Sequence, residues 1–327
     1  MKKVFVLFLS LVISIVSVFS LASCSSYKSL PENATLEEAL KDGNYSLVFE
    51  DNFDGSTLDY TKWKAGYNTP VRRAGYYEDT SDTLFVKDGN LTIRTLYKDG
   101  QYGEGWYTSW VESATNPSKG HAPINSDNYQ GFSAKYGYFE IRCIVPPSEG
   151  IWSAFWLMPD EGTGMSADDV QGTGSDGVEI DIMESPWMFN KSQQNLNVHV
   201  VHGDGYINTK SQKSDSYIIP DIYTSFHTYG VMWTDKEYIF YVDGKETWHT
   251  SHTVDNKTLG VSQVKEYMLI TVEVAGYQDK DGTIHTGKEL LSDGTEADYW
   301  CGNPDNNDKS KYYDFIIDYV KVYQISA

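Results

Sequence analysis

The 327-residue sequence is poor in cysteine and in basic residues, and each shortage excludes a class of protein. Of its three cysteines, Cys143 and Cys301 have no second Cys or His at metal-site spacing, so a structural zinc site is not expected. Lysine and arginine total 26 against 46 aspartates and glutamates, which gives a formal charge of −20. A field of this sign repels nucleic acid and anionic polymers, so we expect no nucleic-acid partner and a neutral substrate.

Long amphipathic helices and internal repeats are also missing from residues 46–327. Short runs of alternating, β-branched and aromatic residues are instead separated by Gly, Asn and Asp, which predicts strands and turns. Residues 238–242 followed by Asp243-Gly244 predict a hairpin. We therefore predict one all-β domain of two packed antiparallel sheets. The predicted strands are residues 91–94, 138–144, 178–183, 196–201, 228–233, 238–242 and 314–324, and a polar loop is expected over 160–175.

The N-terminal segment has the pattern of a secretory signal. Lys2 and Lys3 precede an uncharged apolar run over residues 4–21, and small residues follow up to Cys24. The run is almost long enough to cross a bilayer, so an uncleaved anchor is the alternative. Leu-Ala-Ser-Cys at 21–24 resembles the lipobox of bacterial lipoproteins, which implies export and lipid anchoring through Cys24 to the bacterial membrane or cell surface. We expect a signal over 1–23, a linker over 24–45 and a mature formal charge of −22.

Two cysteines remain once Cys24 is assigned to lipid. In an exported protein, Cys143 and Cys301 can form one disulfide, but they can equally be two buried thiols. Aromatic residues make up 14% of the chain, with 25 tyrosines and 9 tryptophans. Many can fill a β core, and the same excess suits a site that stacks on sugar rings. The sequence leaves both questions open.

Three carboxylates fall within six residues of one predicted strand, at Glu179, Asp181 and Glu184. Alternation places Glu179 and Asp181 on one face of this strand and Ile180 and Ile182 on the other. Strict alternation would turn Glu184 away, but a β-bulge around residues 182–183 would return it to the same face. Three like charges on one strand face destabilise a fold unless they are used. We therefore favour catalysis over a solvent-facing acidic strand or a cation site.

The spacing of these carboxylates suits a retaining glycosidase. Such enzymes need two carboxyl groups about 5–5.5 Å apart, one as nucleophile and one as proton donor. A neighbouring carboxylate raises the pKa of the donor and keeps it protonated near neutral pH. Asp181 lies between the two glutamates and can hydrogen-bond the nucleophile.

At these residues the chain resembles family 16 glycoside hydrolases. Residues 179–184 match the E-x-D-x-x-E signature in the bulged form of laminarinase-like and agarase-like members. The resemblance covers roughly residues 47–324 and implies a jelly roll of two curved antiparallel sheets with a concave substrate cleft. It also implies that Glu179 is the nucleophile, Glu184 the general acid/base and Asp181 their assistant. Four further stretches agree in order, at residues 48–55, 136–140, 152–159 and 318–324.

The resemblance also implies residues that bind substrate. Alternation puts Trp152 and Trp156 on one strand face, where the family has its cleft, so both are expected to be sugar platforms, with core packing as the alternative. His199 is expected near the acid/base, although a structural role is a serious alternative for a lone histidine. We expect Asn68 and Arg73, together with Arg72, to form a cleft-edge loop whose arginines hydrogen-bond sugar hydroxyls, with surface arginines that have no such role as an equal alternative. Glu273 is expected on a cleft strand where lichenases of the family carry Trp, a departure that argues against lichenase-like subsites.

Family members often hold a structural calcium, and the resemblance implies a site here too. The matching ligands are the backbone carbonyls of Asn52 and Gly89 and the carboxylate of Asp318. An all-oxygen set suits calcium. No catalytic metal or organic cofactor is implied.

The leading hypothesis is a monomeric endo-glycosidase that hydrolyses a β-1,3- or mixed-linkage β-glucan with retention. The alternatives are an agarase- or carrageenase-type galactan hydrolase and a non-catalytic carbohydrate-binding jelly roll. A sulfated galactan would need a strongly basic cleft, so the negative charge weighs against it. A pure binder has no use for both glutamates, although fold alone does not decide function.

Overall fold

The computed structural model describes residue 40 and residues 43–161, 177–186, 196–202, 211–254, 257–258 and 260–326. The expected signal and Cys24 lie outside these residues, as does nearly all of the expected polar loop. Within the described part, no helix is both long and apolar enough to cross a membrane. Signal, lipidation and linker therefore stay predictions.

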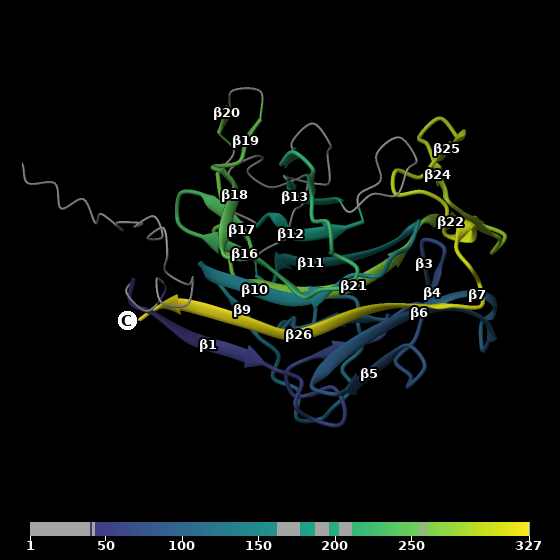
Figure 1. The fold of residues 1–327 in the computed structure, drawn as a ribbon, viewed down its shortest axis with the longest axis horizontal. Helices are drawn as coiled ribbons and strands as arrows, with labels where there is room; N and C mark the ends of the chain where they lie inside the picture. The colour runs from purple at the N-terminus through teal and green to yellow at the C-terminus, as the bar shows by residue number, and fades with distance from the viewer. Residues whose placement is uncertain are drawn as a thin grey trace, which may run out of the picture.

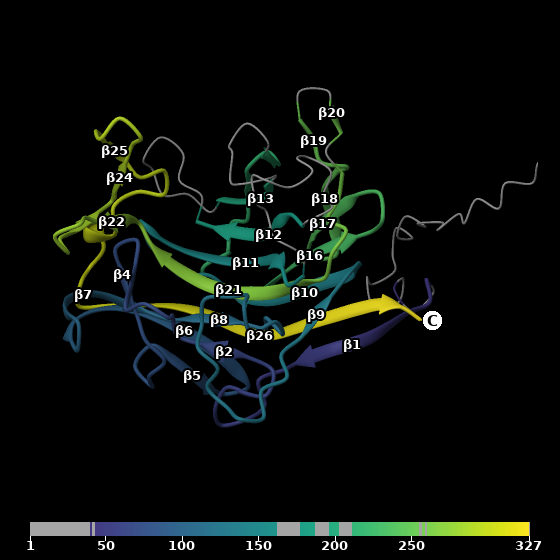
Figure 2. The ribbon, with the colours of Figure 1, turned by 180° about the vertical axis from the view of Figure 1, so that it is seen from behind.

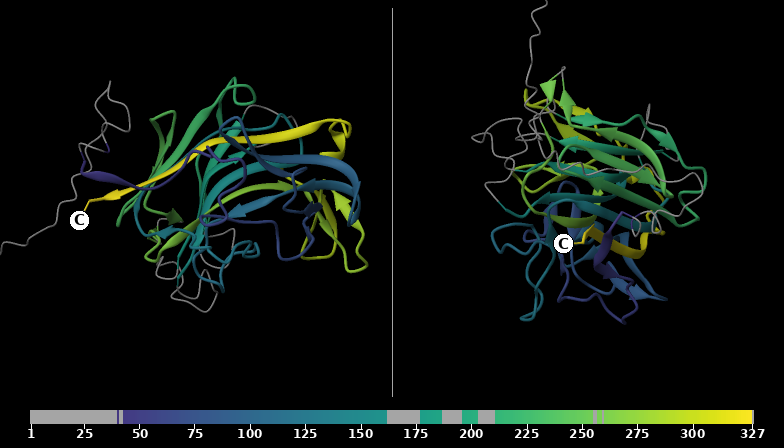
Figure 3. Two further views of the ribbon diagram at one scale, coloured as in Figure 1. Left: turned by 90° about the horizontal axis from the view of Figure 1, so that it is seen from below. Right: turned by 90° about the vertical axis from the view of Figure 1, so that its left-hand side faces the viewer.

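Two large β-sheets lie one above the other, as Figures 1 and 2 show from opposite sides, and Figure 3 shows their curvature. Within the described residues, β4 and β7 form the one parallel pair. The all-β sandwich prediction is confirmed.

The eleven-stranded sheet has nine strands in one continuous path and two that pair beside it. In order of neighbours, the path is β18 (Lys245–Thr250), β17 (Tyr238–Val242), β16 (His227–Trp233), β10 (Gly137–Ile144), β26 (Tyr312–Ile325), β6 (Asn90–Gly100), β7 (Gly103–Thr108), β4 (Gly75–Tyr77) and β3 (Val71–Arg72). In addition, β1 (Tyr45–Asp51) pairs with β26, and β5 (Leu84–Lys87) pairs with β6.

The nine-stranded sheet carries the predicted catalytic strand, β12, between β13 and β11. It runs β14 (Gln212–Lys213), β13 (Leu196–His202), β12 (Glu179–Ser185), β11 (Ile151–Pro159), β21 (Glu266–Val274), β8 (Trp110–Glu112), β2 (Lys64–Ala65), with β15 (Tyr217–Ile218) on β13 and β9 (Ser133–Ala134) on β21. Three two-stranded ladders add β19 (Thr253–Val254) with β20 (Lys257–Thr258), β22 (Gly276–Gln278) with β23 (Ile284–Thr286), and β24 (Lys288–Leu290) with β25 (Glu296–Asp298). A short 3-10 helix, η3, spans Pro304–Asn306.

The hydrophobic core lies between the two sheets. Apolar residues of both sheets pack there in one cluster, because alternate side chains of each strand point to the same layer. The nine-stranded sheet contributes Phe155, Leu157 and Ile180, all fully buried. Phe139 and Phe315 face them from the eleven-stranded sheet. Every strand predicted from the sequence is present, so the alternation of apolar and polar residues was enough to locate these strands.

Two local predictions are settled by the backbone and by the cysteines. Val242 pairs with Lys245 across a two-residue turn, and Asp243 and Gly244 both have positive φ, at 50° and 72°. This is the geometry that a tight hairpin requires, so that prediction is confirmed. Cys143 and Cys301 are both buried and free, which selects two thiols over a disulfide.

The outer face of the nine-stranded sheet, opposite the core, is bordered by hairpins. In Figure 1, β19–β20 rise at one end of this sheet, and β24–β25 rise at the other. The carboxylates of β12 lie on this face, with a second aromatic cluster beside them. We call it the outer face below.

Candidate active site

A β-bulge in β12 brings the third carboxylate to the outer face. Phe155 pairs with Met183, but the next residue, Trp156, pairs with Asp181, so one residue of β12 is left over. Ala154 and Trp156 share the outer face and pair with Glu184 and Asp181, and directly paired residues lie on one face. The bulge predicted from the spacing of the motif is therefore confirmed.

Burial and neighbouring charge raise the pKa of two of the three carboxyl groups. Asp181 is 4% exposed, and burial together with the charge of Glu273 raises its pKa to about 8. Burial is also the main cause that raises the pKa of Glu184 to about 8, and the charge of Asp181 adds to it. His202 and Arg73 act in the opposite direction on Glu184. Near neutral pH this pair of carboxyl groups therefore keeps protons that ordinary carboxyl groups have lost.

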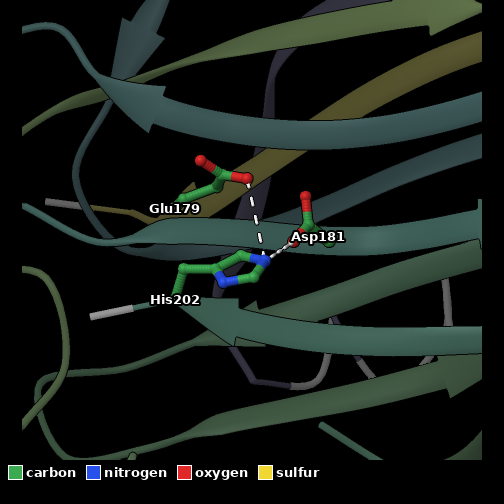
Figure 4. A group of neighbouring side chains, drawn as sticks. All are labelled: Glu179, Asp181 and His202. Carbon is green, nitrogen blue, oxygen red and sulfur yellow. Dashed lines mark ion pairs between the residues drawn. The ribbon is translucent and has the colours of Figure 1, made fainter. Parts of the chain in front are cut away.

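His202, at the end of β13, is the site residue that the sequence did not single out. Its Nε2 lies 3.2 Å from a carboxylate oxygen of Asp181 and 3.8 Å from one of Glu179 (Figure 4). Its Nδ1 lies 2.6 Å from Ser211 Oγ, which orients the ring. Glu179 and His202 are direct partners across β12 and β13. The histidine thus lies directly beside the first two carboxylates.

The expectation that His199 lies near the acid/base is wrong. Its side chain is fully buried on the core side, where its ring stacks on Phe240 at 4.6 Å. Nδ1 lies 2.6 Å from the Ile182 carbonyl oxygen and Nε2 2.9 Å from Thr247 Oγ1. Burial lowers the pKa of His199 to about 3, so the ring stays neutral. The structural role named as the alternative is the one observed.

Trp152 and Trp156 do lie on the outer face, as alternation predicts, but both are almost covered. Trp156 is 7% exposed, donates from Nε1 to Thr271 Oγ1 at 3.0 Å and meets Trp110 edge to face. Trp152 is 4% exposed and stacks on Tyr299 with ring centroids 5.5 Å apart. Their role as sugar platforms stays a prediction.

Arg72 and Arg73 share one carboxylate on the outer face. Each guanidinium donates from Nε to a different oxygen of Glu273, which is buried. Burial alone would raise the pKa of Glu273, but Arg73 and Arg72 hold it below its ordinary value. Arg73 lies over the rings of Trp152 and Tyr299, and its φ of 54° is unusual for a residue other than glycine. Glu273 therefore holds both arginines, and contact of Arg73 or Glu273 with substrate stays a prediction.

Asn68 contributes to this edge mainly through its backbone. Its side chain is exposed, and its N–H donates to the carbonyl of His121 at 2.7 Å. Contact between Asn68 and substrate stays a prediction.

Trp110 is a further outer-face residue that the sequence analysis missed. Its Nε1 donates to the fully buried Glu112 at 2.8 Å, and Lys64 Nζ binds the same carboxylate at 2.8 Å. Arg72 lies over its ring at 5.1 Å. Glu112 and Lys64 thus fix the indole that packs against Trp156.

The expected calcium ligands converge in the fold, but the carboxylate is already engaged. Asn52 follows β1 and Gly89 precedes β6, and both strands pair with β26, which contains Asp318. The Asp318 carboxylate forms an ion pair with Arg142, so a cation would have to share it with a guanidinium. Asn52 also lines a pocket formed by residues 50–55, 57, 59 and 62, away from the β12 carboxylates. Calcium stays a prediction, and no catalytic step depends on it.

A family model matches this architecture and the β12 motif together. Residues 93–286 match the model of glycosyl hydrolases family 16, a stretch that includes Glu179, Asp181, Glu184 and His202. The match covers more than half of the chain. The protein therefore belongs to glycosyl hydrolases family 16.

The known proteins similar to this chain include one named for a glucan and one named for porphyran. Over 257 residues the chain is 24% identical to glucan endo-1,3-beta-glucosidase A1 of Niallia circulans, covering 72% of this chain and 34% of the relative. It is 26% identical to beta-porphyranase E of Zobellia galactanivorans, covering 77% of this chain and 83% of that protein. The chain thus spans only about a third of the length of the first relative.

The fold is also found among solved structures. The catalytic domain of an endo-1,3-beta-glucanase (laminarinase) from Thermotoga petrophila superposes with a TM-score of 0.59 at 22% identity, covering 86% of this chain and 99% of that one. A similarity at this level of identity supports the jelly-roll fold.

Proposed function

We propose that the protein is a retaining endo-glycosidase that hydrolyses a β-1,3- or mixed-linkage β-glucan. The observation that carries the proposal is the bulge in β12, because it places Glu184 on the face of Glu179 and Asp181. A pair of carboxyl groups on one face, one of them protonated at neutral pH, is what double displacement requires. Family membership supplies the reaction class.

In this mechanism the two glutamates have different tasks. Glu184, whose pKa is raised to about 8, gives its proton to the leaving sugar oxygen. Glu179 attacks the anomeric carbon and forms a covalent glycosyl-enzyme. The Glu184 carboxylate then takes a proton from the water that releases the sugar. Protonated Asp181 donates to Glu179 and limits its negative charge until attack.

His202 completes the arrangement by fixing Asp181. The Nδ1 atom of His202 contacts Ser211 Oγ, and this contact turns Nε2 toward the Asp181 carboxyl. The ring therefore limits the orientations that this carboxyl can adopt. We assign His202 as a positioning residue.

We favour a glucan as the substrate because one similar protein is named as a glucan endo-1,3-beta-glucosidase and because the chain is strongly acidic. The test is release of reducing ends from laminarin, barley β-glucan, agarose and carrageenan by the full-length protein. Cleavage of laminarin or barley glucan alone supports the proposal. Cleavage of agarose or carrageenan alone would show that the substrate is a galactan and that the proposed glucan is wrong.

A galactan is the second candidate. It is supported by the similarity to a β-porphyranase and by Arg72 and Arg73, two cations on the outer face that share one carboxylate. The formal charge of −20 opposes a densely sulfated chain, although salt screens this field beyond about 8 Å at physiological ionic strength. The same substrate panel decides between the two.

We also propose that the protein is exported and lipid-anchored through Cys24. The support is the charged start, the apolar run and the Leu-Ala-Ser-Cys sequence. Anchoring would hold the enzyme at a membrane or cell surface, where a polymeric substrate arrives from outside.

A further inference from the structure

Glu179, Asp181 and His202 point one ligand atom each toward a common space (Figure 4). These three atoms all lie within 4.8 Å of one another. His202 Nε2 is 3.2 Å from Asp181 and 3.8 Å from Glu179. Ligands at 2.0–2.2 Å from a tetrahedral zinc ion are about 3.4 Å apart, so a small closure of the trio would complete three zinc bonds.

The orientation of His202 is an independent sign of a ligand. Its Nδ1 lies 2.6 Å from Ser211 Oγ, and an imidazole that donates through Nδ1 presents a lone pair at Nε2. Histidines that bind metals typically donate their other ring N–H to an oxygen in this way. A lone pair at Nε2, 3.2 Å from Asp181 and 3.8 Å from Glu179, is a donor atom that a metal ion can share with the two carboxylates.

Other histidines of the described chain have carboxylate neighbours but no such convergence. Nε2 and Nδ1 of His285 bind different residues, Asp279 at 3.0 Å and Glu296 at 3.1 Å. His227 likewise divides its two nitrogens between Asp221 and Asp243. Carboxylates on opposite edges of a ring cannot share one ion. In the part of the chain that the structure describes, Glu179, Asp181 and His202 are the one group whose ligand atoms meet.

We propose that Glu179, Asp181 and His202 form an inhibitory site for a zinc ion. One imidazole and two carboxylates suit Zn²⁺, whereas Ca²⁺ and Mg²⁺ prefer sets made only of oxygen. Three protein ligands leave the fourth zinc position to water. The formal charge of −20 favours the approach of cations. The bound ion would coordinate the Glu179 carboxylate, which must be free to attack the sugar, so zinc and substrate exclude each other.

This inference rests on the proposed function only for the inhibition, because zinc binding can be measured without turnover. The direct test is calorimetric titration of zinc chloride into the full-length protein and into His202→Gln. The matched control is His285→Gln, which makes the same change away from the carboxylates of β12. Wild type and the control should bind one zinc at this site, and His202→Gln should bind it more than about tenfold more weakly.

A second variant keeps the test decisive if His202→Gln does not fold. Glu179→Gln preserves the side-chain shape, removes one anionic ligand and should also weaken zinc by at least about tenfold. Equal zinc affinity in wild type and in folded His202→Gln or Glu179→Gln would overturn the proposal, as would the absence of binding to wild type.

The inhibition arm uses whichever polysaccharide the protein cuts. Zinc should act competitively with substrate, calcium and magnesium at the same concentration should not, and a chelator should restore the rate. Full activity at saturating zinc would refute the inhibitory role. If no polysaccharide is cut, the proposed function fails while the calorimetric result still decides the site.

Discussion

The Nε2 atom of His202 lies 3.2 Å from a carboxylate oxygen of Asp181, across the pair formed by β13 and β12. His202 faces the central carboxylate of the motif, whereas His199, three residues earlier in the same strand, faces the core. Strand alternation explains the difference, because positions separated by three residues point to opposite faces. The two histidines should therefore fail in different ways when changed.

We predict that His202→Gln lowers kcat by about tenfold to a thousandfold, since positioning by a single group contributes on this scale. KM should change little, and thermal stability should remain near wild type. Steady-state kinetics and circular dichroism melting provide the two readouts. Unchanged kcat in His202→Gln would remove the histidine from the mechanism.

The converse is expected for His199→Gln. Loss of the buried hydrogen bonds at both ring nitrogens should lower the unfolding free energy by about 1–3 kcal/mol per unsatisfied group, with kcat of the folded fraction retained. Urea unfolding measures this cost. A fall in kcat without loss of stability would contradict the placement of His199 in the core.

The pH dependence should show a basic limb that belongs to the general acid. Burial raises the pKa of Glu184 to about 8, and the protonated form is the active one, so kcat/KM on glucan should fall as pH rises through about 8. An aryl β-glycoside with a good leaving group needs no proton, so its kcat/KM should lose most of this limb. The same basic limb on both substrates would point to a group other than Glu184.

A buried carboxyl outside the mechanism should govern part of the pH dependence of stability. Glu266 is fully buried, accepts from the Val178 N–H at 3.2 Å, and burial raises its pKa to about 8. In an unfolded chain the pKa is about 4.3. Between these values the folded group keeps a proton that the unfolded group has released, so the unfolding free energy falls as pH rises from about 4 to about 8.

Glu266→Gln should remove this part of the pH dependence. The variant should match wild type near pH 4 and exceed it near pH 7.5 by an amount on the order of 4 kcal/mol, since about three pH units separate the unfolded pKa from pH 7.5 and one pKa unit corresponds to about 1.4 kcal/mol. Urea midpoints at the two pH values measure it. An equal difference at both pH values would show that Glu266 is not protonated in the folded protein.

The anchoring proposal has a separate test. Cys24→Ala should release the protein from the membrane fraction and leave its specific activity intact, because Cys24 belongs to the segment before the domain. Fractionation followed by an activity assay is sufficient. Retention of the variant in the membrane would favour an uncleaved signal anchor.

The sequence predicts those features of the site that depend on one strand. The spacing within residues 179–184 was enough to predict the bulge. Simple alternation turns Glu184 away from the other two carboxylates, and one extra residue in the strand returns it to their face. The faces of β11 followed from alternation alone. Both are local properties of the chain.

Relations between strands were harder to predict. Which of the two histidines lies beside the carboxylates depends on the register between β13 and β12. The observed register pairs Glu179 with His202 and so puts His202 on the carboxylate face. Glu273 meets Arg72 and Arg73 about 200 positions away, and no local pattern indicates such an ion pair. Trp110 was missed because its partner Glu112 resembles any other strand glutamate until its burial is known.

The assigned roles of Glu179 and Glu184 predict different products when azide replaces the missing carboxylate. With an activated aryl β-glycoside, Glu184→Ala should still form the glycosyl-enzyme, and azide should release it as the β-glycosyl azide. For Glu179→Ser, azide can only attack directly and should give the α-glycosyl azide. The same anomer from both variants would mean that the two roles are wrongly assigned.

The central claim, retention through a Glu179 adduct, is tested most directly by following wild-type hydrolysis of a β-glucan by proton NMR. The anomeric signal of the first product should be β and should then mutarotate toward the equilibrium mixture. An initial α-anomer would establish inversion and would contradict the assignment of Glu179 as the nucleophile.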